Sequence, residues 1–337
     1  MADMKVSALS ALSGPSYNDL MYVVDVSDTT GGASGTSKKA TIKDIFQFAA
    51  NNGNDNGVVI GYQAGALDGT VSDQIAIGFF SGKNTGRTRS QQVNLGRHAG
   101  YDNEGSNAIS IGHAAGQYAN ASSSDSVMVG AYAGRNTGQV ALSYRFSSVM
   151  VGAYAGEKAK SAQTATLVGY AAGQNSGASS SHTVVGAVVV GYGAASASVS
   201  VVDAVVIGRD AGISASTVDY SVMIGALAGG TSGGSRCVYI GYTAGQTLAG
   251  NSKLVVETNS TYAASGTGAL IYGEFDNRLL RFGADTVKLQ KDLILETDQT
   301  PASSTATGTK GMVKWDSNYI YICTATNTWK RAAISTW

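Results

Sequence analysis

One eight-residue pattern constrains the fold of this chain more than any other feature. The pattern apolar-x-apolar-Gly-x-x-Ala-Gly, with small departures, occurs eleven times between Val58 and Gly245, and its first glycine recurs every 16 to 18 residues apart from two steps of 22. Such a period indicates one short unit stacked on copies of itself. The unit has no room for two helices and is rich in Gly, Val, Ile and Ser. We therefore predict an all-β fold in which each copy is one coil of a parallel β-solenoid, a β-roll or β-helix.

The composition excludes several other classes of protein. The chain has 337 residues with no formal net charge, and only 14% of them are charged, so a nucleic-acid partner is not expected. Its 44 glycines follow no Gly-X-Y period, which excludes collagen, and the regular Val and Ile content excludes a disordered linker. The sequence has no apolar run of 18 residues and no signal peptide in residues 1–30, so neither membrane insertion nor secretion is expected.

The three residues before the first glycine of each copy have the pattern of a β-strand. The first and third positions are Val, Ile, Leu or once Thr, and we expect them to fill the solenoid interior. The middle position would then point outward, yet it is apolar in nine of eleven copies. Strands that are apolar on both faces are covered on both faces, so we predict that the middle positions form the interface of a homotrimer. The expected interface residues are Val59, Met128, Met150, Leu167, Val189, Val206, Met223 and Tyr239.

Glycines are expected at the corners of each coil. The first glycine allows backbone angles that a side chain forbids, and the Ala-Gly pair predicts a second tight corner. Ala195 replaces the last glycine in the eighth copy. The two 22-residue steps carry inserts at residues 139–148 and 176–185, which we expect to loop out without interrupting the stack. Over residues 58–250, coils about 4.8 Å apart would form a shaft on the order of 50 Å long.

Residues 1–50 are expected to form a separate N-terminal module, followed by a polar linker at residues 51–57. Residues 20–26 have the pattern of a strand and residues 29–39 that of a Gly/Ser/Thr loop. Thr41 is an expected N-cap of a short helix that runs through Phe48. From physical reasoning alone, this module can be a cap that shields the first coil from edge pairing.

Two further regions follow the repeats. Residues 251–300 are predicted to form a β-rich neck, with strands at 253–257, 269–273, 279–282 and 287–289. Pro301 and the Thr/Gly run after it mark a boundary. Residues 301–337 predict a three-stranded meander with strands at 312–315, 319–322 and 329–332. Its aromatic residues can form a surface that stacks on sugar rings or the packed core of a small unit, and we place the core first. The residues in question, the expected receptor-binding tip, are Trp315, Tyr319, Tyr321 and Trp329.

The sequence carries little chemistry that points to catalysis. It has no phosphate-binding loop and no zinc-binding motif. The histidines His98 and His113 fall on adjacent coils, but a metal needs more ligands than this pair, so we expect no metal and no cofactor. Cys237 and Cys323 are expected to be buried thiols.

Two pairs of carboxylates are close enough in sequence to suggest glycan hydrolysis, namely Asp102 with Glu104 and Asp203 with Asp210. Acidic residues in a solenoid are more commonly solvated loop residues. On this basis we expect that the chain is not an enzyme.

Several segments resemble proteins of tailed bacteriophages. The Ile-Gly-Tyr-x-Ala-Gly copies, such as residues 60–65, resemble repeats in phage fibre and tail proteins. The Ser-Val-Met-Val-Gly phrase at residues 126–130 is similar to the Ser-Val-Ala-Ile-Gly phrase of trimeric autotransporter adhesin heads. Both families imply trimers of parallel β-structure. The longer period and the missing signal peptide and membrane anchor depart from the adhesin pattern and favour the phage family.

The resemblance extends to the flanking regions. The order of features in residues 1–50 resembles the attachment modules of phage fibres, LIYGEFDNRLLRFG from Leu270 resembles the segment that follows such repeats, and residues 301–337 resemble small C-terminal fibre modules.

The resemblance implies a homotrimeric tail fibre, or a similar virion appendage, that attaches the phage to its host. Its N-terminus would dock on a baseplate, tail or adaptor protein, and its tip would bind a host surface receptor such as a glycan. Three tips on one rod would raise the avidity of weak contacts. The alternatives are a tailspike-like glycan depolymerase, a head-surface decoration fibre and a cell-surface trimeric adhesin.

Overall fold

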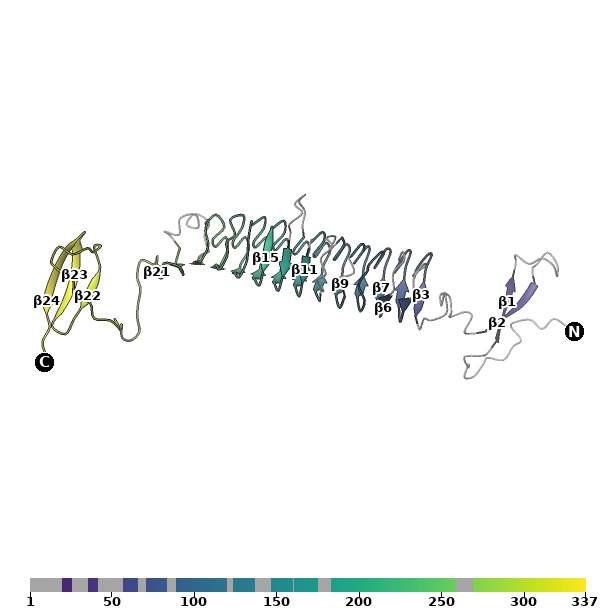
Figure 1. Ribbon diagram of the computed structural model, residues 1–337, viewed down its shortest axis with the longest axis horizontal. Helices are drawn as coiled ribbons and strands as arrows, with labels where there is room; N and C mark the ends of the chain where they lie inside the picture. Colours follow the sequence, from purple (N-terminus) through teal and green to yellow (C-terminus); the bar gives the residue numbers. More distant parts are fainter. Residues whose placement is uncertain are drawn as a thin grey trace. The chain divides into compact units, whose positions relative to one another are not determined.

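The computed structural model describes residues 57–65, 71–83, 89–119, 124–136, 147–159, 161–174, 183–258 and 269–337, together with the backbone of residues 20–25 and 36–41. All regular structure in these residues is β-strand, as predicted (Figure 1). The chain divides into two units, residues 1–283 and residues 284–337. No helix within the described ranges is long and apolar enough to cross a membrane.

The repeat forms the long sheet of a β-solenoid, as predicted. Each copy contributes one three-residue strand, and consecutive strands pair in parallel and in register, so that Met128, Met150 and Leu167 are neighbours across the sheet. The rest of each coil returns the chain to the start of the next strand, which parallel pairing requires. The eleven strands are β3 (Val58–Ile60), β5 (Ile75–Ile77), β7 (Val93–Leu95), β8 (Ile109–Ile111), β9 (Val127–Val129), β10 (Val149–Val151), β12 (Thr166–Val168), β14 (Val188–Val190), β16 (Val205–Ile207), β17 (Val222–Ile224) and β18 (Val238–Ile240).

Both inserts leave this stack unbroken, as predicted. β9 pairs with β10 across the first insert, and β12 pairs with β14 across the second. The second insert is not entirely a loop, because its last three residues form β13 (Thr183–Val185). β13 lies between β11 (Ser161–Gln163) and β15 (Ser200–Val202) in a small parallel sheet. A second short parallel pair joins β4 (Val71–Ser72) to β6 (Arg89–Ser90).

The prediction of which strand positions face the interior is wrong. The middle residue of each strand is buried, except in β3, whereas the first and third residues are half-buried or exposed. In β10 the side chain of Met150 points inward, like that of Ser148 just before the strand, and those of Val149 and Val151 point outward. This is the two-residue alternation of a strand, shifted by one position from the expected register. The middle positions and the alanines at the corners together form the core of the solenoid.

The corner glycines are confirmed, and the structure supplies a reason for each of the two types. Gly130 follows β9 with a φ of +133°, and a Cβ there would lie 2.5 Å from the carbonyl oxygen of Gly152 in the next coil. Gly156 has a φ of +64°, and a Cβ there would lie 2.5 Å from the Sδ of Met150 in the core. At Gly130 the backbone angle and the carbonyl group of the next coil together exclude a side chain. At Gly156 a Cβ would instead force the Met150 side chain to move. Ala195 keeps the left-handed conformation with a φ of +51°.

Strands beyond the last repeat extend the same sheet. β19 (Lys253–Val256) pairs in parallel with β18, and β20 (Ile271–Glu274) and β21 (Leu279–Phe282) follow as antiparallel strands. Three of the four strands predicted for the neck are thus part of the solenoid sheet. The fourth prediction is wrong, because residues 287–289 form no strand and are exposed.

The N-terminal region contains one described strand pair. β1 (Leu20–Asp25) and β2 (Thr36–Thr41) run antiparallel. The strand predicted at residues 20–26 is therefore confirmed, whereas the loop predicted at 29–39 is wrong for residues 36–39, which lie in β2. The helix predicted after Thr41 falls outside the described residues.

The second unit contains the predicted three-stranded meander. β22 (Val313–Trp315), β23 (Tyr319–Ala325) and β24 (Thr328–Ala333) pair as antiparallel neighbours. The small core of this unit consists of Tyr321, Cys323 and Trp329.

The segment before β22 packs onto this core. The indole Nε1 of Trp329 donates a hydrogen bond to the carbonyl oxygen of Ala306 at 3.0 Å. Gly308 lies so close to the indole that a Cβ there would be 2.6 Å from the ring. Residues 300–311 are therefore held against one face of the meander.

Candidate functional site

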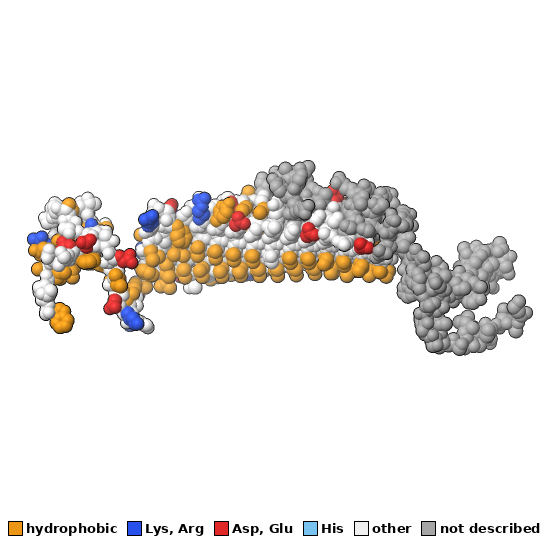
Figure 2. Space-filling view, turned by 60° about the horizontal axis from the view of Figure 1, so that its bottom comes forward, with side chains coloured by type: hydrophobic (Ala, Val, Ile, Leu, Met, Phe, Trp, Pro, Cys, Tyr) orange, Lys and Arg blue, Asp and Glu red, His pale blue; other side chains and the backbone are white. Residues whose placement is uncertain are grey.

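The most extended surface feature of the solenoid is an apolar band along its long sheet. Figure 2 shows this band as continuous orange rows along one side of the shaft. It consists of the first and third residues of the eleven repeat strands of the long sheet, of which Ile60 is 54% exposed and Ile240 39% exposed. A contiguous apolar patch on a soluble protein rarely exceeds a few hundred Å², and this band is on the order of 1,000 Å². The band is therefore a candidate protein–protein interface.

The residues that were predicted to form this interface are not on it. A buried side chain cannot contact a neighbouring chain, whereas the flanking positions face outward. In two coils a serine before the strand helps to fix this alternation. The hydroxyl of Ser148 donates to the carbonyl oxygen of Ala162 at 2.6 Å, and the hydroxyl of Ser221 donates to the carbonyl oxygen of Gly234 at 2.9 Å. Val59 is half-buried, and the other seven predicted residues are each at most 2% exposed, namely Met128, Met150, Leu167, Val189, Val206, Met223 and Tyr239.

A ladder of aromatic rings follows the corner after each of the first eight repeat strands, β3 to β14 in the long sheet, and was not predicted. Rings from successive coils contact one another from Tyr62 to Tyr192, with centroids 5.0 to 6.3 Å apart. His98 and His113, which fall on adjacent coils, belong to this ladder. Burial and the neighbouring Arg97 guanidinium lower the pKa of His98, so its ring is predominantly neutral near pH 7. The sequence did hold a signal, because aromatic residues recur at the fifth and sixth positions of the pattern.

The structure separates one of the two predicted carboxylate pairs. Asp203 and Asp210 lie at opposite ends of β16, and Asp210 forms an ion pair with Arg209 at 3.2 Å. Asp102 and Glu104 remain neighbours at one corner, on either side of the buried Asn103. They are the pair that stays a candidate for acid–base chemistry. Within the described ranges, no group of three or more His, Cys, Asp or Glu side chains is placed to hold a metal ion.

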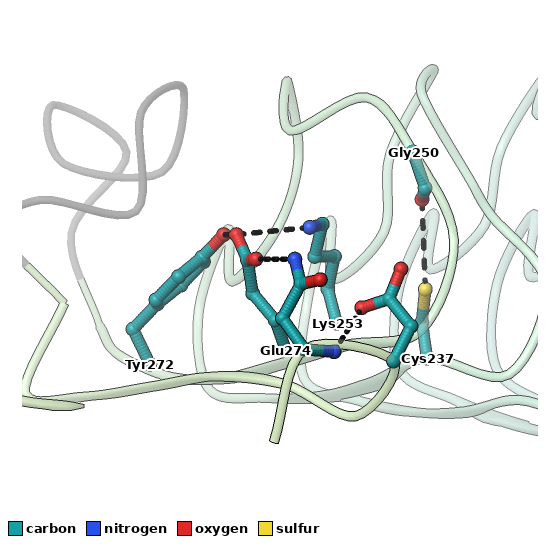
Figure 3. Close-up of polar contacts among 7 residues, drawn as sticks. Cys237, Gly250, Lys253, Tyr272 and Glu274 are labelled. Atoms are coloured by element: carbon teal, nitrogen blue, oxygen red, sulfur yellow. Dashed lines mark hydrogen bonds and ion pairs between the residues drawn. The ribbon is translucent and has the colours of Figure 1, made fainter. Parts of the chain in front are cut away.

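A polar cluster lies at the C-terminal end of the solenoid sheet (Figure 3). Figure 3 shows Lys253, Tyr272 and Glu274 converging from β19 and β20. The Tyr272 hydroxyl donates to the Glu274 carboxylate at 2.5 Å, and the Lys253 Nζ lies 3.0 Å from the same carboxylate. Hydrogen bonds from Tyr272, Asn277 and Lys253 lower the pKa of Glu274 to about 2.

The same contacts fix the protonation of the other two groups. The hydrogen bond to Glu274 raises the pKa of Lys253, and burial together with Glu274 raises the pKa of Tyr272. All three groups therefore keep one protonation state across the neutral range. A general acid or base needs a pKa near the working pH, so the cluster is suited to holding the end of the sheet rather than to proton transfer.

The four aromatic residues predicted for the tip do not form an exposed surface. Tyr321 and Trp329 are each 6% exposed, and Tyr319 packs against them. Trp315 is half-buried, and its Nε1 donates to the carbonyl oxygen of Leu295 at 3.0 Å. This is the packed-core arrangement. Beside it lies a pocket of about 540 Å³, which is lined by Thr300, Pro301, Ala302, Ser303, Ser304, Tyr321, Trp329, Lys330 and Arg331.

Comparison with known proteins finds two relatives, both from bacteriophages. The chain is 42% identical over 69 residues to the "Depolymerase, capsule K30/K69-specific" of Klebsiella phage K64-1, a match that covers 20% of this chain and 9% of the relative. It is 36% identical over 77 residues to the "Depolymerase 1, capsule K30/K69-specific" of Klebsiella phage K5-2, covering 22% and 9%. The matched segment thus spans under a tenth of each relative. No protein-family model and no solved structure matches the chain.

These relatives correct one of our expectations. We expected that the chain is not an enzyme, and this is contradicted, because both matching proteins are named as capsule depolymerases. The partial similarity to phage proteins and the β-solenoid both fit a bacteriophage tail appendage that acts at the host surface.

Proposed function

We propose that the chain belongs to a tailspike-like phage appendage that binds and depolymerises the capsular polysaccharide of its host. The observation that carries this proposal is the similarity to two depolymerases that are specific for K30/K69 capsules. The solenoid supports it, since a stiff stack of coils presents side chains at regular intervals to a repeating polymer. Asp102 and Glu104 are the candidate acid and base among the residues considered above.

In this proposal the appendage is a homotrimer, joined through the apolar band. Two features of the band support this. Its positions are almost all Val, Ile or Leu, which gives a regular surface that identical chains can share. Burying on the order of 1,000 Å² would contribute roughly 25 kcal/mol per chain before costs, and association costs about 4–15 kcal/mol. The interface of the trimer therefore lies at the first and third strand positions, not at the middle ones.

The remaining roles follow from this arrangement. Residues 1–50 attach the trimer to a baseplate, tail or adaptor protein of the virion, the solenoid is the shaft, and residues 301–337 contact the host surface. Attachment and depolymerisation are compatible, because an enzyme that shortens a polymer must first bind it.

The test uses the purified protein and purified capsular polysaccharides of types K30 and K69. Incubation should shorten the polysaccharide, seen as a later elution in size-exclusion chromatography, and should release new reducing ends. A protein that is folded and trimeric but leaves both polysaccharides at full length would contradict the proposal.

The catalytic assignment is tested separately. Asp102→Asn with Glu104→Gln should abolish the shortening, since neither an acid nor a base would remain at that corner. Asp203→Asn with Asp210→Asn is the matched control, because it removes the same charge from corners at the two ends of β16. Equal activity in both double variants would remove Asp102 and Glu104 from the mechanism.

A further inference from the structure

The pocket in the second unit combines three kinds of chemistry in one concave surface. One wall is the segment from Thr300 to Ser304, which supplies hydroxyl groups and backbone. A second part of the lining, here called the floor, is formed by Tyr321 and Trp329, and Lys330 and Arg331 complete the lining. A volume of about 540 Å³ is in the range of pockets that hold small organic ligands and is large for an inorganic anion.

The pocket is built on fixed groups. The Asp316 carboxylate accepts hydrogen bonds from the Tyr321 hydroxyl at 2.6 Å and from the Thr300 hydroxyl at 2.8 Å. It also accepts hydrogen bonds from the backbone N–H groups of Asn318 and Tyr319, both at 2.8 Å. One carboxylate therefore ties the wall of the pocket to its floor, so the cavity is shaped before any ligand arrives.

The part of the chain that forms the pocket is rich in positive charge. Residues 300–337 contain four cationic side chains, Lys310, Lys314, Lys330 and Arg331, and a single carboxylate side chain, Asp316, in a chain whose formal net charge is zero. Asp316 is already engaged by the four hydrogen bonds just described, which hold its pKa at about 2. No ion pair between Arg331 and a carboxylate is found in the part of the chain that the structure describes.

The Arg331 guanidinium packs on the aromatic ring of Tyr319. It lies over the face of Tyr319, 4.2 Å from the ring centroid. Arginine binds a carboxylate with two parallel N–H donors, a geometry that lysine cannot provide. Hydroxyl groups and an aromatic floor beside such a guanidinium suit a ligand that is both a sugar and an anion.

We propose that this pocket binds one carboxylated sugar unit, such as a uronic acid, of a surface polysaccharide, with Arg331 pairing the sugar carboxylate. The inference deepens the proposed function and rests on it for the polymeric source of the sugar, but the binding site itself can be tested alone. It also places the specificity for acidic glycans in the unit that begins at residue 284, apart from the candidate carboxylates of the solenoid.

The experiment compares methyl glucuronide with methyl glucoside as ligands of the full chain. The two differ only at C6, which is a carboxylate in the glucuronide and a hydroxymethyl group in the glucoside. Binding is measured by titrating each sugar and monitoring saturation-transfer NMR, a method that suits a protein of this size and weak ligands. The glucuronide should bind at least tenfold more tightly than the glucoside, and Arg331→Gln should remove that difference. A tenfold change corresponds to about 1.4 kcal/mol, a modest value for a charge-assisted pair.

Two further variants complete the test. Arg331→Lys keeps the charge and should lose part of the preference, since the paired donors are missing. Lys310→Gln removes a cation of the same unit that does not line the pocket, and should bind as the unmodified chain does. Near-ultraviolet circular dichroism of the tryptophans shows whether each variant keeps its fold.

The outcomes separate this proposal from the proposed function. Equal binding of the two sugars, or full binding by Arg331→Gln, would overturn the pocket proposal even if K30 or K69 capsule is degraded. Selective glucuronide binding that Arg331→Gln abolishes would support the pocket even if no capsule is degraded, in which case the depolymerase proposal alone would fall.

Discussion

A matched pair of substitutions in β10 tests the orientation of the repeat strands. Met150 is 2% exposed and Val151 is 36% exposed, although they are consecutive. An aspartate at position 150 would place an unpaired carboxylate in the core, which costs several kcal/mol in addition to the roughly 2–5 kcal/mol lost when a buried methionine is truncated. An aspartate at position 151 would stay in contact with water in a single chain. Its effect on chain folding should be about 1 kcal/mol or less, and its main effect should fall on association.

Hydrogen exchange measured by mass spectrometry suits this test, because stability in a stacked repeat is local and a single melting temperature averages over coils. Met150→Asp should raise exchange of the amides of residues 149–158 by at least thirtyfold, which corresponds to about 2 kcal/mol. Val151→Asp should preserve that protection in the monomer and lower the molecular mass of the assembly. The reverse result, in which position 150 tolerates the charge and position 151 does not, would refute the orientation described here.

Three other perturbations follow from specific contacts. Gly130→Ala should lower the melting temperature, because the φ of +133° and the carbonyl group of the next coil leave no space for a Cβ. The expected strain is about 1–3 kcal/mol. An unchanged melting curve would show that stacking does not need this glycine. Glu157→Gln should destabilise its coil by about 1–3 kcal/mol in chemical denaturation, since the buried carboxylate accepts hydrogen bonds from Arg135 and Gln174. The pKa of Glu274 is about 2 in the folded chain, below its ordinary value of 4.5, so its stabilising effect is complete above pH 4.5 and is lost as the pH falls toward 2. Thermal unfolding across pH 7 to 2 should show a steeper loss below pH 4.5 in the parent than in Glu274→Gln, and parallel curves would contradict the role of this cluster.

The sequence was sufficient to predict the solenoid, because its signals are local. Eleven glycine-terminated strands at a fixed spacing determine a stacked parallel sheet whatever faces inward, and the alternation in residues 312–332 determines the meander. The orientation of the strands was predicted wrongly because both faces are apolar, so hydrophobic period alone cannot choose between them. The size of the residues held a better signal. The outward positions are nearly uniform Val and Ile, whereas the buried middle position ranges from Ala76 to Tyr239, as expected where each coil fills a different space.

The features of the candidate sites were harder to predict for a different reason. The pocket depends on Thr300, Asp316 and Arg331, which are up to 31 positions apart and meet only through the meander and the segment packed on it. No short pattern connects them. The aromatic ladder is a different case, because its rings recur at the fifth and sixth positions of the repeat and so leave a signal in the sequence.

The most direct test of the architecture is the solution mass of the intact protein, measured by light scattering after size-exclusion chromatography. The proposed homotrimer predicts three times the chain mass of 34.3 kDa. A stable monomer of 34.3 kDa would contradict the account, because the band of Val and Ile side chains would then remain exposed to water with no partner to cover it.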